Sequence, residues 1–543
     1  MRRVLALLAL ATLLAGGPYL GWRELRHEEG RRAWPARELL ESGEWIVPQA
    51  LGAPYLAKPP GFPWAVAGVS WAAERLGFEA DPRRDPAPAR GPVTPGRLRF
   101  TNLLGLLALA ACAATAARQV GGDPGAPLRA GLLVLAAPEV LNKARLGEID
   151  PWFAALCGWA ALLGQRGAGP AGLAPGPLLG AAVLLALAVW TKGPLALAFG
   201  LAPLLSLAAV DPHGRRWRLL AAGLLGALAL ASLGLWAALV ARRLDLPAAE
   251  LERLWRGEIL RPDPQSVGVY LADRGRLIAG CVLGFLPGSL LLLALVRPAA
   301  RRELSASPAV RLAAAALVPP LLLLLLWPAV RVRYALPLLP WVALAGAAFF
   351  SPEHAQRACG RVGAAALRAL AVLLGLLGVA AVGLLCWRLG QGADWPVSRL
   401  WPGLAALGAA VLTRRLWIEL KAGRSGRLLA PCLALGLVLR QAELCLSEPP
   451  RWDRSGARAA ARAIDAAAAS AAGPERAALV HVDHWGEFNA LFFVAAELRF
   501  VRDPSALSAG DLLLSKAAPP PGFEPLPLDP DSARGFSLYR RSP

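Results

Sequence analysis

Two adjacent acidic residues, Glu28 and Glu29, stand near the start of a polar stretch at positions 26–64 that also carries Lys58. A carboxylate can act as the base in a transfer reaction, and a cation fixed beside a membrane can bind an anionic lipid headgroup. Polar and apolar residues alternate at helical spacing in this stretch, a pattern that is also typical of interfacial helices that seal a helix bundle. The stretch is therefore a candidate site with a structural alternative.

A second set of charged residues interrupts or follows apolar segments farther along the chain, at Asp150, Lys192 and Arg333, with Tyr334 next to the last. Cations in a poorly solvated cleft stabilise the charge that grows on a phosphate when its bond to a sugar breaks. Structural interpretations exist here too. Asp150 precedes a proline and suits a helix start, Lys192 suits a helix end that reaches toward the membrane surface, and Arg333 suits an interfacial position.

Membrane-spanning helices must position these residues. The chain has 543 residues, of which 56% are hydrophobic and 18% charged, and its mean hydropathy is +0.46. This composition excludes a disordered chain and an ordinary soluble protein. Fourteen apolar segments approach the length needed to cross a bilayer. They lie near 4–22, 60–78, 98–117, 130–142, 151–165, 177–191, 194–210, 219–241, 277–296, 312–329, 334–350, 369–388, 401–413 and 427–446.

The formal net charge of +20 comes largely from arginine-rich connections between these segments. The positive-inside bias places the connections in the cytoplasm, so the charge predicts topology and makes nucleic acid an unnecessary partner. Five segments separate the first two connections, where the number of crossings must be even. We therefore expect the short segment 130–142 to be partial or re-entrant, which leaves thirteen crossings. The connections lie at 75–99, 215–218, 297–311, 357–368 and 414–427.

The predicted fold is a polytopic α-helical membrane protein with a small C-terminal α/β domain. The transmembrane module covers 1–446, its N-terminus is cytoplasmic, and its loops 23–59 and 242–276 lie on the external face. The tail at 450–543 is much less apolar and is expected to be a soluble domain on the same external face.

The tail shows short strand patterns around a helix expected near 487–496. His481, Asp483, His484 and Glu487 are metal-ligand residue types at close spacing. A strand that runs into a loop and a helix explains them equally well, so no motif supports a metal or another cofactor. The expected strands lie at 477–482, 498–501, 511–514 and 535–539.

Several ordered motifs carry a resemblance to a known family. In the first loop, E-E-G-R is followed by A-R-E-L-L-x-S-G-E-W-x-V-P and by L-G-x-P-Y-L-x-K-P-P. Farther along stand A-R-L-G-E-I-D-P-W at 144–152, T-K-G-P at 191–194, W-R-G-E-I-L-R at 255–261 and R-Y-A-L-P-L-L-P at 333–340. To about residue 350 the chain resembles bacterial membrane glycosyltransferases of the aminoarabinose transferase (ArnT-like) group, which are related to the protein O-mannosyltransferases and have the GT-C fold.

The resemblance implies transfer of a sugar from a polyprenyl (undecaprenyl) phosphate carrier at the periplasmic face of a bacterial inner membrane. The acceptor class stays open among lipid A, another glycan and a protein hydroxyl, and membrane lipids are the other expected partners. The family's catalytic carboxylates fall on Glu28, where the family usually has Asp, and on Asp150. The implied carrier-phosphate and sugar-binding residues are Glu29, Arg31, Tyr55, Lys58, Lys192, Glu258, Arg261, Arg333 and Tyr334.

Two other functions remain open at this point. A flippase or transporter of lipid-linked sugars would also need a cationic cavity in a helix bundle, although transporters more often have matched halves with polar residues near mid-membrane. A non-catalytic homologue is the other alternative, because Glu28 replaces the usual Asp. The chain has no Walker loop, dinucleotide fingerprint or nucleophile elbow, which favours a lipid-linked donor over a soluble nucleotide sugar.

Overall fold

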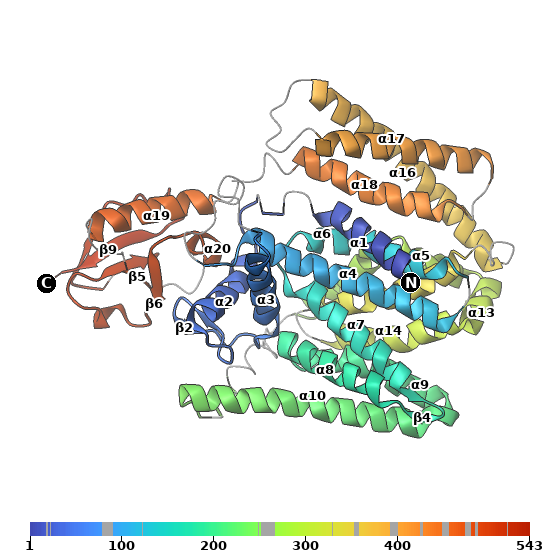
Figure 1. Cartoon of the computed structure of the whole chain (residues 1–543), viewed down its shortest axis with the longest axis horizontal. Helices are drawn as coiled ribbons and strands as arrows, with labels where there is room; N and C mark the ends of the chain where they lie inside the picture. The colour runs from blue at the N-terminus through green and yellow to red at the C-terminus, as the bar shows by residue number, and fades with distance from the viewer. Residues whose placement is uncertain are drawn as a thin grey trace.

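The computed structural model describes most of the chain. The described residues are 1–17, 20–21, 23–78, 91–121, 123–247, 249–250, 253, 266–327, 330–351, 358–390, 400–423, 427–447, 456–472, 479–483, 487–518 and 520–542. Helices dominate, and a small sheet domain lies at one end of a large helix bundle (Figure 1).

The first half of the chain supplies the helices that surround the candidate site. These are α1 (Arg2–Gly16), α2 (Glu29–Ser42), α3 (Gly61–Arg75), α4 (Pro95–Val120), α5 (Ala126–Leu135), α6 (Pro138–Ala144), α7 (Ile149–Gly167), α8 (Pro175–Lys192), α9 (Leu195–Val210), η1 (Pro212–Gly214) and α10 (Arg215–Leu244). Two short antiparallel hairpins interrupt them, β1 (Gln49–Ala50) with β2 (Ala53–Pro54) and β3 (Ala168–Gly169) with β4 (Gly172–Leu173).

The second half completes the bundle. Its helices are α12 (Val267–Gly284), η2 (Gly288–Val296), α13 (Pro298–Ala306), α14 (Pro308–Leu326), η3 (Val332–Leu338), α15 (Leu339–Phe349), α16 (Ala358–Gly390), α17 (Leu400–Lys421) and α18 (Leu429–Ser447).

Seven helical segments in the described part of the chain are long and apolar enough to cross a membrane. The bent pair of α12 and η2, which meet at 109°, is one further candidate. The protein is therefore a multi-pass membrane protein. Thirteen crossings stays a prediction, because helices such as α9, with 16 residues, fall short of the roughly 20 residues that a perpendicular span needs. The segment 130–142 is broken between α5 and α6. However, α5 begins beside the end of α4, and α6 ends beside Glu148 near the start of α7, so the two helices together run the length of α4 and the expected partial element is not confirmed.

Small residues let the central helices approach closely. A β-carbon at Gly105 of α4 would lie 3.0 Å from the backbone of Trp152 in α7, and one at Gly158 would lie 3.2 Å from the sulfur of Cys112. Close approach at small residues is the usual way in which helices pack in a membrane, where burial of apolar area gives little driving force. This packing fixes the first turn of α7, which carries Asp150, against α4.

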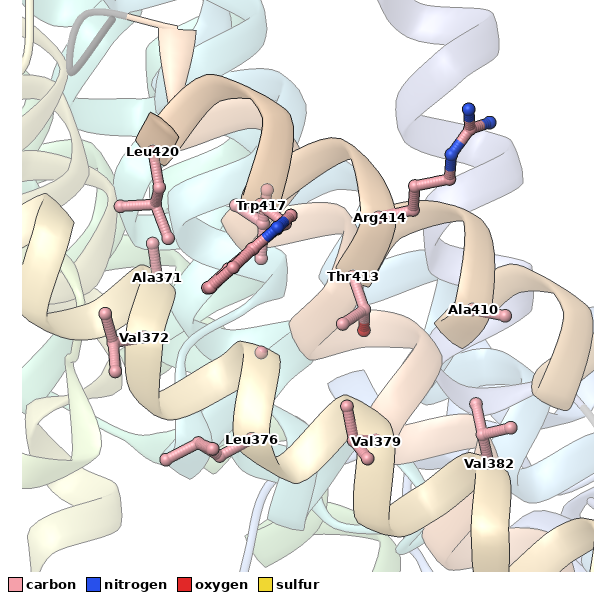
Figure 2. Close-up of a pocket in the computed structure, with 12 residues that line it drawn as sticks. Ala371, Val372, Leu376, Val379, Val382, Ala410, Thr413, Arg414, Trp417 and Leu420 are labelled. Carbon is pink, nitrogen blue, oxygen red and sulfur yellow. The ribbon is translucent and has the colours of Figure 1, made fainter. Parts of the chain in front are cut away.

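The helices α16 and α17 pack together at the edge of the bundle (Figure 1). They enclose a groove of about 490 Å³ (Figure 2). Figure 2 shows Leu376 and Val379 of α16 facing Thr413 and Trp417 of α17, whereas the guanidinium of Arg414 points away. The lining is almost entirely apolar, so the groove suits hydrocarbon chains and offers no catalytic group.

The tail forms a five-stranded sheet with the order β6-β5-β7-β9-β8. The central strand β5 pairs in parallel with β6 and β7, and β9 is antiparallel to β7 and β8. Four of the strands match the predicted ones within a few residues; the edge strand β8 and the helix α19 were not predicted. The tail elements are α19 (Ala457–Ala472), β5 (Leu479–Val482), α20 (Phe488–Leu491), β6 (Glu497–Phe500), η7 (Pro504–Ala506), β7 (Leu512–Ser515), β8 (Phe523–Pro525) and β9 (Ser537–Arg541).

The tail shares a hydrophobic core with the first loop. Trp34 of α2 and Tyr55 belong to the same buried cluster as Val480 of β5 and Phe492. The amide of Phe500 in β6 also donates to the carbonyl of Leu51 between β1 and β2, at 2.6 Å. The tail therefore packs directly on the loop that carries the predicted site residues.

Candidate functional site

Asp150, Lys192, Arg333 and Tyr334 come together at one end of the helix bundle. The ammonium of Lys192 donates to Oδ1 of Asp150, and Nε of Arg333 lies 3.9 Å from Oδ2 of the same carboxylate. The ammonium is also 4.2 Å from the centre of the Tyr334 ring, a cation–π distance. Four residues separated by up to 184 positions thus form one cluster, which we call the Asp150 cluster.

Local sequence explains where two of these residues point. Glu148 is the residue before α7, and Asp150 lies in the first turn, where a carboxylate is favoured by the helix dipole. Lys192 is the last residue of α8, and Gly193 adopts φ 79°, a conformation in which glycine avoids the clash of a side chain. The next residue, Pro194, directly precedes α9. The motif T-K-G-P therefore holds an ammonium at a sharp helix end.

Two residues that were not predicted as site residues extend the cluster. The ammonium of Lys143 lies 3.0 Å from Oε2 of Glu148, and a guanidinium nitrogen of Arg333 lies 3.6 Å from the same oxygen. Glu148 is part of the G-E-I-D segment at 147–150, and Lys143 precedes that segment by four residues. Nε of Arg333 is buried and donates no hydrogen bond within the described residues. Because a buried donor without an acceptor is costly, this guanidinium is suited to an incoming anion.

Glu28 lies before the first residue of α2 and is 30% exposed. Its Oε2 is 3.2 Å from the guanidinium of Arg31 and 3.6 Å from that of Arg32. The field of its carboxylate also acts on Arg333. Of the two predicted catalytic carboxylates, Asp150 lies within ion-pair distance of Arg333, whereas Glu28 adds only a weaker electrostatic attraction.

Glu29, the next residue, has a very different environment because it is completely buried. Its oxygens accept hydrogen bonds from Nε and Nη2 of Arg99, at 2.7 and 2.9 Å, and from the amides of Gly147 and Arg26. Burial alone would raise the pKa of the Glu29 carboxyl, but the charge and hydrogen bonds of Arg99, with Arg23 and the Gly147 amide, hold that pKa below its usual range.

Arg99 also donates to the carbonyls of three residues in the segment that leads into α2, namely Leu20, Arg23 and Glu24. The Glu29–Arg99 pair thus ties that segment and α2 to α4 and to the turn before α7. This geometry favours a positioning role for Glu29 rather than the substrate-binding role that was predicted for it. Arg99 was missed because the connection 75–99 was predicted to be cytoplasmic, on the face opposite the 23–59 loop. Its contact with Glu29 puts the end of that connection on the same face as the loop, so this part of the predicted topology is wrong.

Arg31 and Tyr55 lie beside the tail. The guanidinium of Arg31 is 5.9 Å from the centre of the Tyr55 ring, and that ring meets the Phe488 ring edge to face at 6.5 Å. Lys58 is half-buried between β2 and α3. Glu258 and Arg261 lie outside the described residues.

The short helix α20 sits directly on α2. The amide of Gly30 donates to Oδ1 of Asn489 at 2.8 Å, and the indole of Trp34 donates to the carbonyl of Phe488. A guanidinium nitrogen of Arg37 donates to the carbonyl of Phe492, and the group stacks 3.6 Å from the centre of that ring. No local sequence signal marks these contacts, because they join residues more than 450 positions apart.

The tail histidine His481 lies on β5, where burial lowers its pKa. Glu487 contacts Lys516 at 3.1 Å and Arg534 at 3.3 Å. Among the described residues, no group of three His, Cys, Asp or Glu side chains is arranged to hold a metal. His484 lies outside the described residues.

The fold and the site together define a multi-pass membrane protein with a charged cluster at one end of the bundle, covered by an amphipathic loop and a sheet domain. The crystal structure of ArnT from Cupriavidus metallidurans in the apo state has this fold, with a TM-score of 0.66 and 18% identity over 99% of this chain and 97% of that one. The same protein bound to undecaprenyl phosphate gives a TM-score of 0.66 and 17% identity over the same shares. The chain therefore has the ArnT-like GT-C fold, as the sequence resemblance predicted.

The Archaeoglobus fulgidus oligosaccharyltransferase in its apo form is also similar, with a TM-score of 0.47 and 13% identity over 93% of this chain and 64% of that one. No protein-family model and no curated protein matches the chain by sequence.

Proposed function

We propose that this protein is an integral-membrane glycosyltransferase that transfers a sugar from a polyprenyl phosphate carrier to an acceptor at the periplasmic face of a bacterial inner membrane. The observation that carries the proposal is the Asp150 cluster on an ArnT-like fold, in which Lys192 and Arg333 both lie beside the predicted catalytic carboxylate of Asp150. The ArnT structure with undecaprenyl phosphate supports the choice of carrier.

In this proposal the cations hold the carrier. Breaking the bond between the sugar carbon and the phosphate oxygen leaves negative charge on the phosphate. Arg333, whose Nε has no hydrogen-bond acceptor among the described residues, would bind that phosphate, with Lys58 and Arg261 as the further predicted ligands. Their attraction grows as the charge develops, so it lowers the barrier more than it strengthens ground-state binding.

The two carboxylates take different tasks. Lys192 and Arg333 both contact Asp150, so this carboxylate is best suited to orienting the cations and the donor. Glu28 is the more exposed and sits at the loop edge, where an acceptor would enter. We therefore assign Glu28 as the base for a hydroxyl acceptor, and an ionised phosphate acceptor would need mainly positioning.

The test is sugar transfer from a polyprenyl phosphate donor in membranes that contain Glu28→Gln or Asp150→Asn, with lipid A, a surface glycan fraction and periplasmic proteins as separate acceptors. We expect each variant to lose at least about 100-fold in transfer rate. Glu74→Gln, a half-exposed carboxylate in α3, is the matched control and should leave the rate unchanged. Full transfer in both variants would contradict the catalytic assignment, and carrier movement without transfer in the unaltered protein would identify a flippase.

A further inference from the structure

A polar cavity of about 1240 Å³ lies at the far end of the bundle from the Asp150 cluster. Helix α7 connects the two places, because Asp150 is in its first turn and Arg166, which lines the cavity, is in its last. The sixteen residues between them correspond to about 24 Å along a helix axis. The cavity is therefore separate from the proposed active site.

Three arginines from three different helices line this cavity. Arg118 and Arg166 lie in the last turns of α4 and α7, and Arg311 lies in the first turn of α14. Within the described residues, none of the three forms an ion pair. Asp211 also lines the cavity, but its carboxylate is already engaged by Arg218 at 2.7 Å. The cavity therefore has a net positive lining that no acidic residue in the described part of the chain neutralises.

A buried polar group adds an independent sign of a ligand. Nε2 of Gln165, which lines the cavity beside Arg166, is buried and has no hydrogen-bond acceptor among the described residues. Gln165 itself is partly exposed, so rotation of its side chain would turn this unpaired donor toward an anion in the cavity. Guanidinium and amide donors that converge from separate helices match the several oxygens of a phosphate group.

We infer that this cavity binds a phosphate group, carried either by a membrane lipid or by an anion free in solution. Basic pockets between the ends of transmembrane helices are suited to lipid headgroups. These three arginines differ from ordinary positive-inside arginines because they come from three helices and line one cavity. Arg118, Arg166 and Arg311 are exposed, as are Arg215, Arg301 and Arg302 on the neighbouring helices α10 and α13, but only the first three line the cavity.

The experiment measures binding of short-chain phosphatidylglycerol to the full chain in a neutral detergent, by native mass spectrometry over a range of lipid concentrations. The test variant carries Arg118→Gln, Arg166→Gln and Arg311→Gln, and the control carries Arg215→Gln, Arg301→Gln and Arg302→Gln, which removes the same charge. We expect affinity to fall by at least about tenfold in the first variant and less than about twofold in the second. Equal losses in both variants, or binding that does not saturate, would overturn the inference.

A parallel titration with inorganic phosphate identifies the source of the group. Saturable phosphate binding that only the test variant loses would indicate a free anion, and loss confined to phosphatidylglycerol would indicate a lipid. Phosphatidylcholine, whose headgroup has no net charge, should bind at least about tenfold more weakly than phosphatidylglycerol. If the triple variant does not fold, the single variant Arg311→Gln is measured in its place. An unchanged affinity for both phosphatidylglycerol and inorganic phosphate would contradict the proposed site.

Discussion

The Glu29–Arg99 pair and the Asp150 cluster each contain a buried carboxylate paired with a cation at the same end of the molecule. They differ in how fully the protein satisfies the hydrogen bonds of these groups. Glu29 is inaccessible, and both of its oxygens accept two hydrogen bonds from protein groups. Asp150 is nearly as buried, but its partner Arg333 is 18% exposed and approaches no closer than 3.9 Å. A carboxylate whose oxygens are fully hydrogen-bonded inside the protein is suited to a structural role. An ion pair with a partly exposed cation can also bind a substrate.

This contrast also separates two residues that are adjacent in the sequence. Glu28 and Glu29 are chemically identical, but the first is 30% exposed and the second is closed off inside the loop. The predictions below test whether stability and activity divide along the same line.

The largest expected effect is on stability, from Arg99→Leu. Removing the guanidinium leaves the Glu29 carboxylate buried without its partner, which costs about 3–5 kcal/mol. We expect a large fall in the unfolding temperature in detergent, measured by intrinsic tryptophan fluorescence. Transfer activity per folded molecule should remain within about threefold of the unaltered protein. A stable but inactive variant would place Glu29 and Arg99 in the chemistry.

Lys192→Gln should lower the transfer activity strongly and the stability only slightly. The ammonium is the nearest cation to Asp150, and removal of one electrostatic group of this kind typically lowers a rate by about 10²–10³-fold. The measurement is the transfer rate at saturating donor, with Lys192→Arg as the charge-conserving comparison. Arg333 still faces Asp150 in the variant, so unfolding should change less than in Arg99→Leu. Full activity in Lys192→Gln would remove this residue from the site.

The pH dependence of stability tests the environment of Glu38 in the first loop. Burial raises the pKa of Glu38 to about 7 from an ordinary value of 4.5, even though the amides of Gly52 and Leu51 lower it. A carboxyl with a raised pKa in the folded state favours the protonated form, so stability falls as the pH rises from about 4.5 through 7. The effect is at most about 3 kcal/mol.

The check on Glu38 is the unfolding temperature measured from pH 5 to pH 8. Glu38→Gln should flatten the decline, because glutamine carries no proton to lose. The same decline in both proteins would show that another group is responsible.

The smallest expected effect comes from Gly30→Ala in α2. A β-carbon there would lie 2.5 Å from the backbone carbon of Phe488, so α20 must shift, at a cost of about 1–3 kcal/mol. We expect faster protease cleavage of the tail while the bundle stays intact. Gly43→Ala, at the end of the same helix, has open space but a φ of 71°, which makes it a control for strain without a clash. Equal protease sensitivity in both variants would argue against docking of the tail on α2.

Much of the architecture followed from the sequence. Long apolar runs predicted the membrane helices, because a bilayer imposes internal hydrogen bonding and a minimum length on each span. Alternating apolar residues predicted four tail strands. The exact number of spans did not follow, because several helices are shorter or more polar than an average span.

The sequence by itself determined the residue types of the site and their order, since motifs such as G-E-I-D and T-K-G-P set local turns and helix ends. Only the tertiary structure decided which charges meet. It joined Asp150 to Lys192 and Arg333, assigned Arg99 to Glu29, and placed the tail on the first loop. The physical reason is that burial and the count of hydrogen-bond partners, which distinguish a structural carboxylate from an available one, arise from helices packed across hundreds of positions.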